Sequence, residues 1–172
     1  MMLKKWIYIS ALLMLPFFSN AQRIAYVDTD YILGKIESYG IANQTMEQYA
    51  QKWQQEVDAK YKEVDAMYKK YQAEEFLLTA ELKKQREDEI INKEKEATAL
   101  QQKYFSPDGE MSKKRKELIQ PIQEKVFSAI EKIATNLGYD FIFDKAATSS
   151  PIIFSNPKFD VSEQVLKSLQ IN

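Results

Sequence analysis

Residues 41–104 contain neither proline nor glycine, and this feature constrains the fold more than any other. The span is rich in Lys, Glu, Gln and Ala, which favour helix. A single helix over this span would be roughly 96 Å long and would need a packing partner along its whole length. A hairpin that reverses near residues 75–79 gives an outgoing arm over 41–76 of roughly 54 Å, and a return arm that buries the same seam. We favour the hairpin, with the uninterrupted helix as the alternative.

Apolar side chains recur every three or four residues along the outgoing arm, as on the contact face of a coiled coil. The members of this stripe are Met46, Ala50, Trp53, Val57, Tyr61, Val64, Tyr68 and Tyr71. A sparser stripe on the return arm consists of Leu82, Ile90, Ala97, Leu100 and Tyr104. We interpret the two stripes as the seam of the hairpin rather than as a ligand groove, and the thin return stripe as typical of a flexible arm.

Three consecutive large apolar residues, Phe76, Leu77 and Leu78, lie at the expected reversal. A hairpin has few neighbours there to cover them. Either they fold onto Tyr71 and Leu82 and cap the hairpin, or they remain exposed and contact another protein.

After the hairpin, the chain is expected to return to its starting point through one more helix. Ser106-Pro107-Asp108-Gly109 is a turn signature. From Glu110 an apolar series with helical spacing runs to Leu137, and Gly138 is expected to end this helix as its C-cap. Pro121 lies inside the series and predicts a kink.

Short apolar runs near both ends of the chain predict a small β-rich base. The three strands are expected over residues 24–28, 139–144 and 151–155. Asp28-Thr29-Asp30 supplies N-cap side chains for a helical turn, and a short helix is expected from Val161 to Leu169. We therefore divide the chain into a body, residues 22–40 and 120–172, and a helical hairpin arm, residues 41–119. A core this small is marginal alone, so we expect the sheets of several subunits to join.

The residue inventory argues against an enzyme. The chain contains no histidine and no cysteine, which excludes His-dependent nucleophile pairs, thiolate or imidazole metal sites and disulfides. The four glycines are not placed to form a phosphate-binding loop. The 24 basic and 25 acidic residues give a formal charge of −1, which does not favour nucleic acid. We expect no catalytic residue, no cofactor, no metal and no nucleic-acid partner.

Residues 1–21 have the features of a secretory signal peptide. Two lysines precede an uncharged, mostly apolar stretch from Trp6 to Phe18, and small residues at Ser19 and Ala21 predict cleavage after Ala21. The alternative is an uncleaved N-terminal anchor. Cleavage would leave 22 basic and 25 acidic residues, a formal charge of −3.

Several segments together resemble the Skp (OmpH-like) family of periplasmic chaperones. They are Tyr26-Val27-Asp28 after the export signal, the Gln/Lys/Glu-rich hairpin, the run from Arg115 to Ile122, the run from Gly138 to Asp144, and the end of the chain from Val161 to Leu169. The resemblance covers essentially the whole mature chain. It implies an α+β fold in which a long antiparallel helical hairpin, or tentacle, extends from a small β-sheet body, and three bodies join into a β-barrel. It also implies an ATP-independent holdase of the periplasm that keeps unfolded outer-membrane β-barrel proteins in a cavity between the three arms.

Two groups of residues are the candidates for this function. The client-binding candidates are Phe76, Leu77, Leu78, Trp53, Tyr61 and Tyr68. The trimerisation candidates are Ile24, Tyr26, Phe141, Ile142, Phe143 and Ile153. The alternative function is a structural coiled-coil protein of the envelope that bridges partners, which would need a continuous apolar seam on the return arm.

Charge separates this chain from the enterobacterial members that it resembles. Those members are strongly basic, whereas the mature charge here is −3. This argues against lipopolysaccharide as a partner and against strong electrostatic capture of acidic clients. The short basic run from Lys113 to Lys116 is interpreted as a solvated helix face, with an anion site as the alternative.

Overall fold

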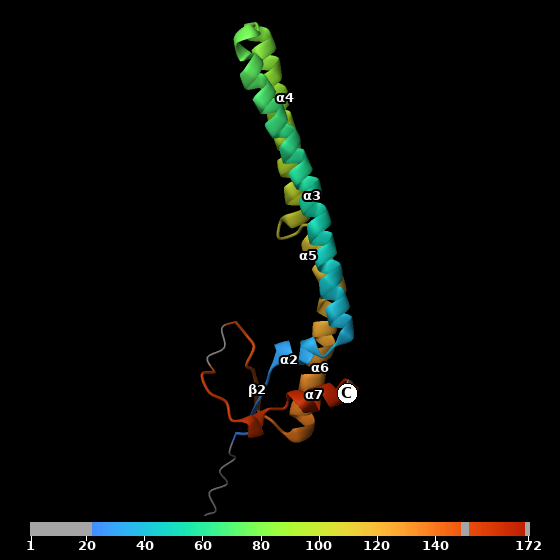
Figure 1. Ribbon diagram of the computed structural model, residues 1–172. Helices are drawn as coiled ribbons and strands as arrows, with labels where there is room; N and C mark the ends of the chain where they lie inside the picture. Colours follow the sequence, from blue (N-terminus) through green and yellow to red (C-terminus); the bar gives the residue numbers. More distant parts are fainter. Residues whose placement is uncertain (1–21, 149–151, 171–172) are drawn as a thin grey trace, which may run out of the picture.

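The structure is a computed structural model that describes residues 22–148 and 152–170. Figure 1 shows a long helical hairpin that projects from a small base, so the predicted α+β fold is confirmed. The elements in chain order are β1 (Ile24–Val27), α2 (Thr29–Gly34), α3 (Glu37–Glu74), the 3₁₀ helix η1 (Glu75–Leu77), α4 (Ala80–Phe105), α5 (Glu110–Leu118), α6 (Gln120–Leu137), β2 (Phe141–Asp144), the 3₁₀ helix η2 (Pro157–Phe159) and α7 (Ser162–Ser168). Within the described ranges, no helix is both long and apolar enough to cross a membrane.

The arm is an antiparallel pair of helices, α3 and α4, joined by a sharp reversal. α3 has 38 residues, which makes it roughly 57 Å long, and it begins before the predicted residue 41. The 3₁₀ helix η1 ends the outgoing course, and Thr79 caps the return helix because its Oγ1 accepts a hydrogen bond from the backbone N–H of Leu82 at 3.4 Å. The predicted reversal near 75–79 is confirmed, and the uninterrupted helix is wrong.

The return course is divided into three helices. α4 ends at a turn in which the N–H of Gly109 donates to the carbonyl of Ser106 at 2.9 Å, as the turn signature predicts. α5 then continues along α3. The chain breaks at Ile119, and Pro121 lies in the first turn of α6, where its missing N–H removes no helical hydrogen bond. The predicted kink thus corresponds to an interruption at one residue, Ile119, whose φ of −95° and ψ of −46° stay in the helical region.

The base is built on a two-stranded parallel sheet, and the whole arm is the connection between its strands. β1 pairs with β2 so that Ile24 lies opposite Phe141 and Tyr26 opposite Phe143. Gly138 ends α6 at a φ of 66°, the left-handed C-cap that the sequence predicts, and this turns the chain into β2. One face of the sheet packs against α2, α6 and α7. The core beneath it consists of Ala25, Val27, Ile32, Leu33, Ile36, Val126, Ala129, Val161, Val165 and Leu166.

The predicted third strand over residues 151–155 is wrong. Its described part, residues 152–155, has no regular structure. The segment that follows takes the free edge of β1 instead: Tyr26 forms an isolated bridge with Asp160, and its carbonyl accepts the N–H of Val161 at 3.0 Å. An apolar run indicates strand propensity but does not identify a pairing partner. In this chain a polar residue, Asp160, pairs with the edge of β1 instead.

Gly109 is expected to tolerate no side chain. A Cβ atom at this position would lie 2.8 Å from the carbonyl oxygens of Lys103 and Tyr104. We expect Gly109→Ala to lower the free energy of unfolding by about 1–3 kcal/mol, as overpacking does, in urea denaturation followed by circular dichroism. Gly34→Ala is the matched control because no atom lies within 4 Å of its Cβ position, and we expect unchanged or slightly higher stability. Equal losses in the two variants would contradict this account of the turn.

Candidate functional site

The half of the arm nearer the base is held together by buried aromatic and apolar side chains. Trp53 is only 9% exposed, and its ring stacks on that of Tyr104 with centroids 4.9 Å apart and planes 7° apart. Val57 is fully buried in the same cluster. Such an aromatic pair contributes about 0.5–1.5 kcal/mol beyond the burial of its area. The predicted seam is confirmed in this half of the arm.

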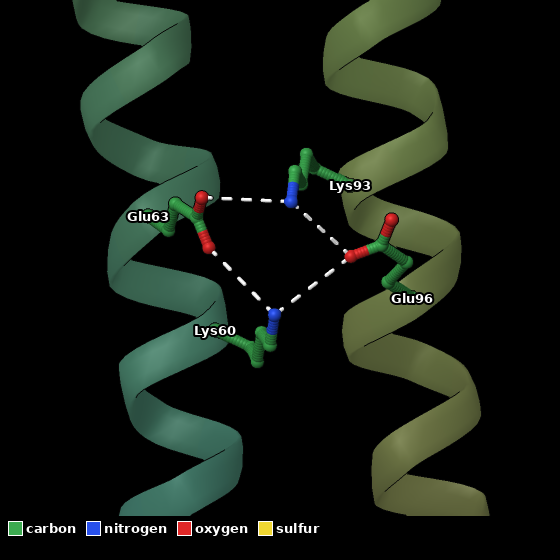
Figure 2. Close-up of polar contacts among 4 residues, drawn as sticks. All are labelled: Lys60, Glu63, Lys93 and Glu96. Atoms are coloured by element: carbon green, nitrogen blue, oxygen red, sulfur yellow. Dashed lines mark hydrogen bonds and ion pairs between the residues drawn. The ribbon is translucent and has the colours of Figure 1, made fainter.

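Towards the tip, polar cross-links replace much of the apolar packing between the helices. Figure 2 shows Lys60 and Glu63 of α3 and Lys93 and Glu96 of α4 in a closed ring of alternating charge. The N–O distances around the ring are 3.9 Å for Lys60–Glu63, 3.6 Å for Glu63–Lys93, 3.3 Å for Lys93–Glu96 and 3.8 Å for Lys60–Glu96. All four side chains are between one third and about one half exposed, so each pair contributes only about 0–1 kcal/mol. The ring therefore serves mainly to align the two helices.

Tyrosine hydroxyls form two further links between α3 and α4. The Tyr61 hydroxyl donates to Oε1 of Gln101 at 3.0 Å, and the Tyr71 hydroxyl donates to Oε1 of Glu87 at 2.6 Å. The hydrogen bond to Glu87 raises the pKa of Tyr71 to about 12, so the phenol keeps its proton, and the link persists, into the alkaline range. Both rings are thereby held at the edge of the seam.

The tip presents apolar side chains to solvent. Phe76 is 79% exposed and Leu77 is 73% exposed, whereas Leu78 is half-buried. Of the two interpretations of this segment, capping of the hairpin is therefore wrong for Phe76 and Leu77. Exposed apolar side chains at the end of a long arm are available to another protein.

A groove of about 470 Å³ lies along the arm where the seam is polar. Its lining residues are Tyr61, Val64, Asp65, Tyr68, Tyr71, Glu87, Ile90, Ile91 and Glu94. Tyr68 is 50% exposed and Ile91 is 44% exposed, so the groove offers aromatic and aliphatic surface to solvent. The apolar stripe of the outgoing arm is interpreted from the sequence as hairpin seam rather than as a groove, and in this half of the arm that interpretation is wrong. The return helix has too few large apolar residues here to cover the tyrosine rings.

The client-binding candidates occupy three different environments. Phe76 and Leu77 lie at the exposed tip, and Tyr61 and Tyr68 line the groove. Trp53 is buried against α4 in this state, so its indole is not accessible to another chain. Sequence reasoning missed Ile91, although an Ile-Ile pair in an otherwise charged helix signals that one of the two faces solvent.

The trimerisation candidates lie on both faces of the sheet. The register places Ile24, Phe141 and Phe143 on the face away from the core, and all three side chains are roughly half exposed. The rings of Phe141 and Phe143 have centroids 6.4 Å apart. Tyr26 belongs to the same face but is buried, and Ile142 points the other way, against the core of its own chain.

The loop before η2 adds more apolar surface at the base. Ile153 is fully exposed and Phe154 nearly so. Together with Ile24, Phe143 and Phe159, Phe154 lines a second groove of about 520 Å³. The outer face of this sheet therefore carries an apolar patch for which the described part of the chain provides only partial cover.

The basic run from Lys113 to Lys116 is partly neutralised within its own helix. Lys113 pairs with Glu110 at 2.8 Å, and Lys114 pairs with Glu117 at 2.7 Å. These i,i+3 pairs favour the interpretation as a solvated helix face over that as an anion site. Among the described residues, no group of three or more acidic side chains is arranged to hold a metal ion.

Comparison with known proteins identifies the family. The sequence profile of the family described as outer membrane protein (OmpH-like) matches residues 23–169, from β1 to the end of α7. The chain belongs to the OmpH-like family. The resemblance drawn from the sequence is thereby confirmed.

Solved structures share the fold of this OmpH-like chain. It is similar to a protein of Caulobacter crescentus CB15 that is provisionally assigned as an outer membrane chaperone (OmpH-like), with a TM-score of 0.61 and 12% sequence identity. The similarity covers 87% of this chain and 84% of that chain, and at this identity it shows the fold alone. No curated protein matches the chain significantly.

Trp53 and Tyr68, two members of the apolar stripe on α3, should respond very differently to truncation. We expect Trp53→Ala to lower the free energy of unfolding by about 3–5 kcal/mol, because it removes a buried ring from the seam. Tyr68→Ala should change it by less than about 0.5 kcal/mol, because half of its side chain is already in solvent. Urea denaturation measures both. A comparable loss for Tyr68→Ala would mean that the groove is closed in solution.

Proposed function

We propose that this OmpH-like chain is an ATP-independent holdase chaperone of the periplasm that binds unfolded outer-membrane β-barrel proteins between helical arms. The observation that carries the proposal is the exposed apolar and aromatic surface on the arm, formed by Phe76 and Leu77 at the tip and Tyr68 in the groove. Membership of the OmpH-like family and the provisional chaperone assignment of the protein from Caulobacter crescentus support it.

The contacts available on the arm suit weak and reversible retention. The tip offers two large apolar side chains, and the groove is shallow and mixed in character. Each contact with an unfolded chain would be weak, but several arms that act together raise the effective concentration of binding surface. A client can then be retained while each single contact still breaks readily.

The residue inventory supports independence from nucleotide hydrolysis. The chain has no histidine, no cysteine and no glycine-rich phosphate loop, so nucleotide-dependent catalysis has no evident site. Residues 1–21, the proposed signal peptide, lie outside the described residues. Their sequence favours export, which agrees with a periplasmic function. The mature charge of −3 disfavours nucleic acid and lipopolysaccharide as partners.

We also propose that the chain forms a homotrimer through its base. A two-stranded sheet is marginal by itself, and its outer face carries the half-exposed side chains of Ile24, Phe141 and Phe143. An apolar face of this kind is typical of a surface that is covered in an assembly. Three joined bases would also bring three arms together around one cavity.

The structural coiled-coil alternative has less support. It needs a continuous apolar seam. In the outer half of this arm the apolar seam is thin, with Ile90 and the small Ala97 as the buried residues of α4. The charged ring and the tyrosine hydroxyls form the other cross-links there. A seam of this composition suits an arm that adapts to a client better than a rigid spacer.

Holdase activity is expected without nucleotide. The purified protein in excess should suppress light scattering when a urea-unfolded outer-membrane β-barrel protein is diluted into buffer. Salt should weaken this suppression only modestly, because the net charge of the protein is small. Equal scattering with and without the protein would contradict the proposal and favour the structural alternative.

The contribution of the tip can be separated within the same assay. Phe76→Ser with Leu77→Ser should weaken suppression and leave the unfolding transition unchanged, since both side chains are exposed. Ile41→Ser is the matched control, because Ile41 is an exposed apolar residue at the other end of α3. Equal effects of the tip and control variants would argue against a role for the tip.

The oligomeric state should depend on the outer face of the sheet. Light scattering at micromolar concentration should give the mass of three chains. Phe143→Asp should reduce this mass and preserve the circular dichroism spectrum, because Phe143 points away from the core of its own chain. Ile142→Asp should instead unfold the base, because Ile142 packs against that core. A monomeric wild-type protein would contradict the trimer.

A further inference from the structure

The groove on the arm has two chemically different walls. α3 contributes the aromatic wall, with Tyr61, Tyr68 and Tyr71. On α4, Glu87, Ile91 and Glu94 follow one another at spacings of four and three residues, so they form one line along the helix. An aliphatic side chain therefore lies between two carboxylates and opposite the tyrosine rings.

The charges in the groove are acidic and only partly compensated. The charged lining residues are Asp65, Glu87 and Glu94. Asp65 pairs with Lys69 at 2.7 Å, and Glu87 accepts the Tyr71 hydroxyl at 2.6 Å. Among the described residues, no side chain forms an ion pair or a hydrogen bond with Glu94. Glu94 is exposed, and the residues that line the groove with it include no lysine or arginine.

The other side of the seam has the opposite character. There Lys60 and Lys93 neutralise Glu63 and Glu96 in the charged ring of Figure 2. None of these four residues lines the groove, because the helical period turns their side chains to the other side of the contact. The arm thus has one charge-balanced side and one side that combines exposed rings with an unpaired carboxylate.

We propose that this groove binds a basic side chain of an extended client segment. The cationic head would pair with Glu94, and the aliphatic stem would lie on Ile91 beneath the Tyr68 ring. Arginine and lysine combine these two properties, and a cation near a tyrosine face gains a further attraction. This inference rests on the proposed holdase function and adds a preference within it: the arm selects client segments in which a basic residue stands among apolar ones.

The expected preference is modest because the groove is open. An exposed ion pair contributes about 0.2–1 kcal/mol, and an exposed cation–π contact contributes about 0.5–1 kcal/mol. The ion pair is therefore worth about 1.4- to fivefold in affinity, and the cation–π contact about two- to fivefold. Such a preference biases the register in which an unfolded chain lies along the arm without making the complex tight.

The test uses two labelled peptides with the same apolar sequence, one with arginine and one with glutamine at a single central position. Fluorescence anisotropy measures their affinity for the purified full-length protein. Because the arginine peptide gains both contacts, we expect it to bind at least about threefold more tightly. High salt should reduce this difference, because ion pairs at exposed sites are screened.

Two variants locate the preference in the groove. Glu94→Gln should reduce the difference between the peptides to the part that the contact with Tyr68 supplies, and should leave the affinity of the glutamine peptide unchanged. Glu131→Gln is the matched control, since it makes the same charge change at an exposed residue of α6 outside the groove, and it should preserve the difference. Tyr68→Ser should weaken both peptides, and the arginine peptide more.

The outcomes separate this inference from the proposed function. Equal affinity of the two peptides for the wild-type protein, or equal effects of Glu94→Gln and Glu131→Gln, would overturn the groove preference. So would the absence of binding by either peptide at millimolar concentration. The aggregation assay with an intact unfolded client is independent: if the protein suppresses aggregation but shows no peptide preference, only the inference fails. If it does not suppress aggregation, the proposed function itself fails.

Discussion

The antiparallel contact between α3 and α4 determines which side chains of the arm are buried and which are exposed to solvent. Near the base the contact is a packed seam centred on the stacked rings of Trp53 and Tyr104. Towards the tip the apolar contact thins to Ala97 and Ile90 on α4, and a ring of four charged side chains and two tyrosine hydrogen bonds add polar links. Because burial of apolar area dominates packing energy, the inner half anchors the arm, and the outer half is held by weaker and more exposed links. The same change in chemistry leaves the tyrosine rings uncovered and creates the groove.

The base follows from a second constraint, which is that the described part of the chain provides two strands for its sheet. One face of this sheet is covered by α2, α6 and α7, and the core of the base lies beneath it. The opposite face holds Phe141 and Phe143 at the surface. When one side of a sheet is covered by its own chain and the other is not, the uncovered side can pack against another subunit. This is the physical basis of the proposed trimer.

Different parts of the arm surface differ in chemical character. The tip is apolar, one side of the outer half is charge-balanced, and the other side is aromatic and acidic. For a proposed holdase, this division means that different parts of one client would meet different surfaces. A small net charge with local differences in sign suits reversible contact with varied unfolded chains better than one strongly charged cavity.

Elements that depend on local signals could be predicted from the residues alone. The span free of glycine and proline predicted the hairpin, Gly138 predicted the left-handed end of α6, and Pro121 predicted the interruption before it, because each acts through its own backbone or helix propensity. The exposure of Phe76 was left open between two interpretations, since it depends on what covers the tip. The predicted strand over 151–155 failed because strand pairing depends on which segment reaches the edge of β1, and Asp160 reaches it. The burial of Trp53 and the position of Tyr68 in a groove depend on tertiary packing. Both residues belong to one periodic stripe, and their difference arises from the residues that α4 places opposite them.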